Sequence, residues 1–287
     1  MARRDAWHRL IGFTGIGIPS NDVGKAQAVK KGTSDMQSDA GRAADPLSSK
    51  EFWDKHWKIE DKGHADSYIF DRVMRNYLPI GGTYFEVGCA PGTTMAYFNR
   101  NFGYQVSGID FSSTNLVHDT MARYHISDYC VVDGDFLAYS APDRYDVVGS
   151  FGFVEHFKDY VTVIRLQARL VRSGGYMVIE VPNLRFFNWL LYRIFLPETL
   201  KMHNLAAMDP DRLLAAARCE GDFRPLYCSY HGTCFLHFDA QNPLLSRRPW
   251  LRRAVALART ALDRVGFGNI PSRYFSPYIL MIARRDS

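Results

Sequence analysis

Short apolar segments with strand character alternate with helical segments along the middle of the chain. The strand segments are rich in β-branched and aromatic residues, and the segments between them repeat apolar residues at helical spacing. The predicted strands cover residues 83–88, 105–110, 129–132, 145–151 and 176–181. The predicted helices between them cover residues 93–101, 113–125 and 160–171. Because strands joined by crossover helices run in the same direction, this alternation predicts a parallel sheet.

The C-terminal third adds one more helix and two more strands. Asp209 is suited to cap a helix that runs to Glu220, and the segments 223–232 and 273–285 have strand character. Two strands added after the alternating part indicate an antiparallel edge. We therefore predict an α/β fold with a doubly wound, mostly parallel seven-stranded sheet, helices on both faces and an antiparallel C-terminal edge strand.

The N-terminal residues differ in composition from the rest of the chain. From Pro19 to about Ser49 they include almost no large apolar side chains, so they bury too little surface to repay the cost of ordering. We expect a flexible leader at residues 1–46 and one domain at residues 47–287. The five cysteines form no CxxC pair, and no run approaches the roughly 20 apolar residues of a membrane-spanning helix. These features favour a cytoplasmic location.

A turn of small residues interrupts the stretch YFEVGCAPGTTMAYF, residues 84–98, between a predicted strand and a predicted helix. After Glu86, the small residues Gly88, Ala90 and Gly92 stand at positions i, i+2 and i+4. A loop that binds a dinucleotide has glycines at i, i+2 and i+5, and here the last of these positions holds threonine. The spacing therefore disfavours a dinucleotide.

An acid followed by this spacing resembles motif I, (D/E)xGxGxG, of the class I S-adenosylmethionine-dependent methyltransferases. Further landmarks follow in the family's order: Asp110 ends the second strand, GDF follows the third, EH follows the fourth and SGG precedes the fifth. Together they cover residues 84–183, and Ala90 departs from the pattern by standing where the family prefers glycine. The resemblance implies a Rossmann-like fold that uses S-adenosylmethionine as methyl donor and releases S-adenosylhomocysteine.

The resemblance also implies a donor site at the strand ends. Asp110 is expected to accept the ribose hydroxyls and Asp135 the adenine amine, while Glu86 favours the sulfonium and the amino group of the donor. The predicted donor-binding residues are Glu86, Gly88, Ala90, Gly92, Asp110, Phe111, Asp135, Phe136 and Ser150. Structural roles remain open, with Asp110 as a helix cap, Asp135 as a turn residue and the two phenylalanines as core.

A catalytic base is needed only if the nucleophile must lose a proton, as an alcohol or a phenol does. His156 in the segment FVEHF follows the fourth strand, at the edge where the methyl group is expected, and Glu155 can orient it. We predict His156 as the base and Glu155 as its partner. The alternative is that His156 caps the next helix or packs beneath it. No metal ligand is predicted.

An apolar and aromatic insertion at residues 184–208 follows the fifth predicted strand. It either caps a hydrophobic acceptor pocket or forms a buried core helix. Under the first interpretation it selects the substrate. The predicted acceptor-lining residues are Trp189, Tyr192, His203 and Asn204.

Motifs that do not occur narrow the class of acceptor. The segment GSFGF after the fourth strand lacks the (D/N)PPY of enzymes that methylate nucleobase amines and the acid of the ribose-methylating enzymes. Resemblance to bacterial methyltransferases that modify sugars and quinones favours O-methylation of a small-molecule, saccharide or lipid-linked acceptor, although oxygen, nitrogen and carbon nucleophiles all remain open. A protein that binds S-adenosylmethionine without catalysis is the alternative, and a nucleic-acid methyltransferase is the third choice.

The net charge of +5 is concentrated in one segment, residues 244–265, which contains six arginines and one acid. Within it, residues 248–265 predict an amphipathic helix with arginines along one face. Such a helix either packs on the sheet as an ordinary surface helix or lies on the anionic inner face of a membrane, near a lipid-linked substrate.

Overall fold

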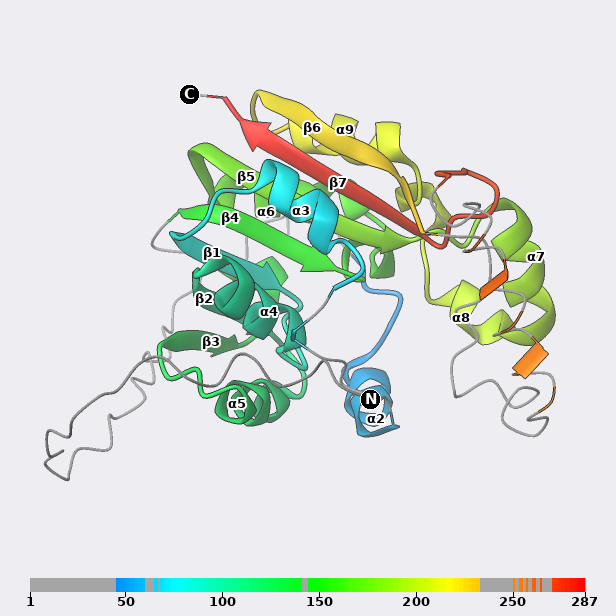
Figure 1. Ribbon diagram of the computed structural model, residues 1–287, viewed down its shortest axis with the longest axis horizontal. Helices are drawn as coiled ribbons and strands as arrows, with labels where there is room; N and C mark the ends of the chain where they lie inside the picture. The colour runs from blue at the N-terminus through cyan, green and yellow to red at the C-terminus, as the bar shows by residue number, and fades with distance from the viewer. Residues whose placement is uncertain are drawn as a thin grey trace, which may run out of the picture. The chain divides into compact units, whose positions relative to one another are not determined.

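The computed structural model describes residues 45–59, 65–66, 68–140, 144–232 and 270–286, with isolated positions between 250 and 264 (Figure 1). The predicted leader at residues 1–46 lies outside the described residues apart from its last two positions, and so does most of the predicted basic helix at 248–265. In the part of the chain that is described, no helix is long and apolar enough to cross a membrane.

In the described chain, seven strands form one sheet in the order β3-β2-β1-β4-β5-β7-β6 (Figure 1). Their bounds are β1 (Thr83–Val87), β2 (Gln105–Asp110), β3 (Tyr129–Asp133), β4 (Tyr145–Phe151), β5 (Val171–Pro182), β6 (Phe223–His231) and β7 (Tyr278–Arg285). Neighbours among β1 to β5 run parallel, and β7 runs antiparallel to both β5 and β6. The predicted sheet is confirmed. Its antiparallel edge strand is β6, because the C-terminal strand β7 lies between β5 and β6.

Helices cover both faces of this sheet (Figure 1). Their bounds are α2 (Lys50–Ile59), α3 (Asp71–Tyr77), α4 (Thr93–Phe102), α5 (Thr114–Arg123), α6 (Tyr160–Leu170), α7 (Phe186–Phe195), α8 (Pro197–Lys201) and α9 (Pro210–Arg218). The short 3-10 helices are η1 (Phe136–Ala138), η2 (Val154–His156) and η3 (Leu205–Ala207). One core forms beneath α3, α4 and α5, and the other beneath α6 and α9.

Successive apolar side chains along a strand pack alternately into the two cores. In β1, Tyr84 packs in the core beneath α4, whereas its neighbour Phe85 packs in the core beneath α6. Val147 and Val148 of β4 divide between the two cores in the same way. Because successive side chains of a strand point to opposite faces, a strand covered on both sides is apolar along its length.

The sheet grows in opposite directions from β1. Strands β2 and β3 extend it on one side, and β4 and β5 extend it on the other. In open α/β sheets, ligands bind beside such a reversal, outside the carboxyl ends of the strands. The turn at residues 88–92 after β1, Asp110 at the end of β2 and η2 after β4 lie at this edge. The fold therefore brings the predicted donor and catalytic residues to one place.

Candidate active site

Two glycines shape the turn between β1 and α4. Gly88 and Gly92 have φ angles of 74° and 93°, in the region that favours glycine. A Cβ atom on Gly88 would lie 2.4 Å from Cδ2 of Phe153, and one on Gly92 would lie 2.9 Å from Cγ1 of Val117. Gly92 also precedes the first turn of α4, whose amide groups have no partner within the helix. The packing of Phe153 and Val117 therefore requires glycine at both positions, and the turn brings the N-terminus of α4 to the ligand-binding edge of the sheet.

Ala90 departs from the glycine pattern without disturbing the turn. Its methyl group is buried in the same apolar cluster as Met95 and Val117. Its backbone N–H donates to Oδ2 of Asp110 at 2.9 Å. The backbone of Ala90 therefore hydrogen-bonds to Asp110, while its side chain packs in the core.

Replacing Ala90 with glycine is expected to leave the affinity for S-adenosylhomocysteine unchanged and to lower the free energy of unfolding by about 1 to 2 kcal/mol, through the lost methyl burial and the added freedom of the unfolded chain. Isothermal titration and chemical denaturation measure the two quantities. A severe loss of affinity in a folded A90G variant would show that the turn does not hold the donor.

Asp110 joins the loops that follow β1 and β2. Its Oδ2 accepts from the N–H of Ala90 and its Oδ1 from the N–H of Ser112, both at 2.9 Å. It does not cap α5, because the N-cap position is Ser113. Burial raises the pKa of Asp110 to about 6, against the lowering effect of the two amide donors. Each carboxylate oxygen has a second lone pair, so Asp110 can still accept the two ribose hydroxyls.

Three more predicted donor-binding residues lie in the loops after β2 and β3, namely Phe111, Asp135 and Phe136. Oδ1 of Asp135 accepts from the N–H of Leu137 at 2.9 Å, so this carboxylate caps η1, whereas the alternative from the sequence was a turn residue. Phe136 is buried in the core beneath α6. Phe111 is half-buried, and its carbonyl oxygen accepts from Nζ of Lys50 at 2.6 Å.

The two other predicted donor-binding side chains have partners inside the protein. Glu86 is buried on β1 and accepts at Oε2 from the hydroxyl of Tyr84 at 3.0 Å. Burial raises the pKa of the Glu86 carboxyl. The hydroxyl of Ser150 on β4 donates to Oε1 of Gln167 in α6 at 3.0 Å, which directs it into the core.

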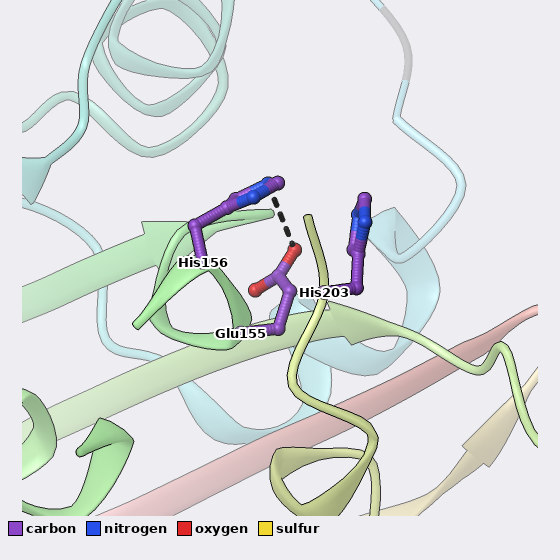
Figure 2. A group of neighbouring side chains, drawn as sticks. All are labelled: Glu155, His156 and His203. Atoms are coloured by element: carbon purple, nitrogen blue, oxygen red, sulfur yellow. Dashed lines mark ion pairs between the residues drawn. The ribbon is translucent and has the colours of Figure 1, made fainter. Parts of the chain in front are cut away.

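His156 and Glu155 lie together in η2, directly after β4 (Figure 2). Nδ1 of His156 lies 2.9 Å from the carbonyl oxygen of Met202. Because a carbonyl only accepts, Nδ1 carries the hydrogen, and in the neutral ring Nε2 has the lone pair. Nε2 lies 3.7 Å from Oε1 of Glu155, and both side chains are buried. This tautomer is the one in which Nε2 can take a proton or bind a cation.

The insertion at residues 184–208 docks on η2 through its C-terminal part. The N–H of Asn204 donates to the carbonyl of Glu155 at 2.7 Å, and its side chain donates to the carbonyl of Phe157 at 3.0 Å. The ring of His203 lies 4.4 Å from that of His156, between centroids. The other two predicted lining residues lie on α7, where Tyr192 packs against the core and Trp189 is 38% exposed.

Helix α2 contacts both η2 and the loop after β2, and the sequence did not reveal these contacts. The Trp53 ring packs edge-on against His156, with centroids 4.8 Å apart. The carboxylate of Asp54 accepts from the hydroxyls of Ser112 and Ser113 at 3.1 and 3.0 Å. The aromatic face of the segment EFWDKHW is a signal for packing, but no local pattern says which residues it packs against.

Comparison with known proteins identifies the class. A family model described as a methyltransferase domain matches residues 62–223, more than half of the chain. The chain belongs to this methyltransferase family, and the resemblance to the class I S-adenosylmethionine-dependent enzymes is confirmed. A similar curated protein is a ubiquinone biosynthesis O-methyltransferase of Nitrosomonas europaea, 31% identical over 157 residues. The match covers 50% of this chain and 65% of that relative, which is less than two thirds of its length.

Solved structures confirm the fold at low sequence identity. A protein described as a sarcosine dimethylglycine methyltransferase from Galdieria sulphuraria aligns with a TM-score of 0.55 at 17% identity, over 83% of this chain and 98% of that one. The cyclase SpnF aligns with a TM-score of 0.54 at 14% identity, over 85% of this chain and 97% of that one. Since a protein described as a cyclase shares the fold, the reaction must be argued from the residues of the site.

Proposed function

We propose that this chain transfers the methyl group of S-adenosylmethionine to a hydroxyl oxygen of a small-molecule acceptor. The observation that supports binding of this donor is the half-buried Asp110 carboxylate, which accepts hydrogen bonds from the backbone of both loops at the reversal of the sheet. Family membership supports the same donor. When bound, S-adenosylmethionine supplies a methyl group on a positively charged sulfur.

The residues of the site divide the remaining work. Asp110 orients the donor through its ribose, and the turn at residues 88–92 supplies backbone donors beside the sheet edge. The Glu155–His156 pair is assigned to the acceptor, where loss of the hydroxyl proton must be assisted. The alignment of the reacting atoms, not covalent chemistry by the protein, is the main contribution of such a site.

The acceptor is proposed to be a hydroxylated, largely apolar small molecule of the phenolic kind. The relative from Nitrosomonas europaea is named for O-methylation in ubiquinone biosynthesis, and that name supports an oxygen nucleophile. The insertion contains the apolar helix α7, and its C-terminal part contacts Glu155 and His156 through Asn204 and His203. This composition supports an apolar acceptor. We assign residues 184–208 the role of a cap over this acceptor.

Donor binding is expected to depend on pH through Asp110. The ionised carboxylate accepts two hydroxyls, whereas the protonated form does so poorly, so binding lowers the pKa of Asp110 from about 6. Affinity is therefore highest above pH 6 and falls as the pH drops through that value, by about tenfold at about pH 5. Calorimetric titration with S-adenosylhomocysteine across this range measures the dependence. A flat profile in the wild-type chain would contradict the role of Asp110 and weaken the proposed function.

A further inference from the structure

Glu155, His156 and His203 form a compact group of three side chains whose ligand atoms all lie within 4.8 Å of one another (Figure 2). His203 comes from the insertion, whereas the other two come from η2. The three residues are therefore assembled by the fold and not by one local segment.

Both imidazoles are fixed in the tautomer that suits a metal ligand. Nδ1 of His156 faces the carbonyl of Met202 at 2.9 Å, and Nδ1 of His203 faces the carbonyl of Thr199 at 2.6 Å. Each Nδ1 must carry the hydrogen, which leaves the lone pair on each Nε2. Metal-bound histidines use this arrangement, in which the second ring nitrogen donates to a carbonyl or a carboxylate. Burial also lowers the pKa of His203, which favours the neutral ring.

The carboxyl group of Glu155 is buried and only one of its oxygens lies near His156. Glu155 is 1% exposed, and its Oε2 has no hydrogen-bond partner. Glu180 on β5 lies close enough to raise the pKa of Glu155 further, beyond the effect of burial, and Oε1 of Glu180 is also buried without a partner. No lysine or arginine among the described residues forms an ion pair with either carboxylate. A bound cation would offset the cost of burying the Glu155 carboxylate at this place.

We propose that Glu155, His156 and His203 bind one divalent transition-metal ion of the zinc type. Two imidazoles and one carboxylate are a ligand set of catalytic zinc sites, which leave a further position open. Nε2 of His156 and Oε1 of Glu155 are 3.7 Å apart, close to the about 3.4 Å that separates two ligands of a tetrahedral zinc ion. The imidazoles favour zinc over magnesium, which prefers an all-oxygen shell.

The role of this ion in the reaction rests on the proposed function, although its binding does not. An acceptor hydroxyl at the open position loses its proton to solvent more easily, because the cation lowers the pKa of a bound oxygen. The oxygen then uses its electron pair to form the new bond to the methyl carbon, while the bond between that carbon and sulfur breaks and its electron pair returns to sulfur, which leaves S-adenosylhomocysteine. Under this proposal His156 acts as a ligand, and the cation takes over the acid–base role that the sequence assigned to the histidine.

Calorimetric titration of the chelator-treated full chain with Zn²⁺ tests the site. The wild type is expected to bind one equivalent. The variants E155Q and H203A are expected to bind it roughly 100-fold more weakly or not at all, since each removes one ligand. His118 is exposed and lies outside the group, so H118A is the matched control and is expected to bind like the wild type. Binding of S-adenosylhomocysteine by each variant shows that it is folded.

Zinc binding that is absent from the wild type, or equally strong in folded H203A or E155Q, would overturn the proposal. Cobalt substitution gives a second measurement, because the visible spectrum of Co²⁺ reports its ligands and is expected to change in H203A but not in H118A. Failure of the proposed function has a different signature. In that case zinc binds as expected, but S-adenosylhomocysteine does not.

Discussion

Replacing Asp110 with asparagine is expected to weaken the binding of S-adenosylhomocysteine by roughly 100-fold, because hydrogen bonds to a charged group are worth about 1.5 to 3 kcal/mol. The neutral side chain loses the charge that both ribose hydroxyls use. Its amide nitrogen must also face the N–H of Ala90 or of Ser112, each of which now donates to a carboxylate oxygen at 2.9 Å. Two N–H groups then face each other without an acceptor between them, which destabilises the loops after β1 and β2.

Isothermal titration at pH 7.5, a roughly neutral pH at which Asp110 is ionised, measures this effect. Asp133 is the matched control, because it pairs with Asp110 in the register of β2 and β3 and is exposed. D133N is expected to bind like the wild type. An unchanged affinity in D110N would mean that the donor does not bind at the end of β2. The pH dependence between 5 and 7, the rough range around the Asp110 pKa, is expected to vanish in D110N.

Replacing His156 with alanine is expected to lower the rate of methyl transfer by roughly 10² to 10⁴-fold, the range that a positioned acid–base group contributes. Binding of S-adenosylhomocysteine is expected to persist, because no described hydrogen bond joins His156 to the turn at residues 88–92 or to Asp110. The result is the same whether His156 acts as a base or as a ligand.

Product formation in single-turnover reactions, measured alongside calorimetry, separates the two effects in H156A. The exposed His118 again provides the control, with H118A expected to retain full turnover. Trp53 packs against the ring of His156, so a thermal unfolding curve is recorded to confirm that the variant is folded. Full turnover in H156A would show that His156 has no role in activating the acceptor hydroxyl.

The parallel part of the sheet and the glycine turn at residues 88–92 could be predicted because their signals are local. The alternation of side chains along a strand places Tyr84 and Phe85 in opposite cores. The spacing of Gly88 and Gly92 after Glu86 lies within one short segment of the sequence. The position of Asp110 could be predicted because it ends a strand next to β1. In folds of this kind, ligands generally bind outside the carboxyl ends of the strands.

The rest of the site depends on contacts between distant segments. His203 lies 47 positions after His156 in the chain, and only the docking of the insertion on η2 brings their rings together. The contact of helix α2 with His156 through Trp53 could not be predicted, because aromatic residues in a segment indicate packing but do not identify the partner. For the same reason the sequence predicted an antiparallel edge without showing that β7 lies between β5 and β6.

The central claim is that this chain methylates a hydroxyl oxygen, and transfer of a labelled methyl group tests it most directly. The chain is incubated with methyl-labelled S-adenosylmethionine and a set of phenols, polyphenols and saccharides, with and without Zn²⁺, and the products are identified by mass spectrometry. We expect a labelled methyl ether of a phenolic acceptor with the wild type and none with H156A. Donor binding without transfer to any hydroxyl, or a label on nitrogen or carbon, would contradict the account.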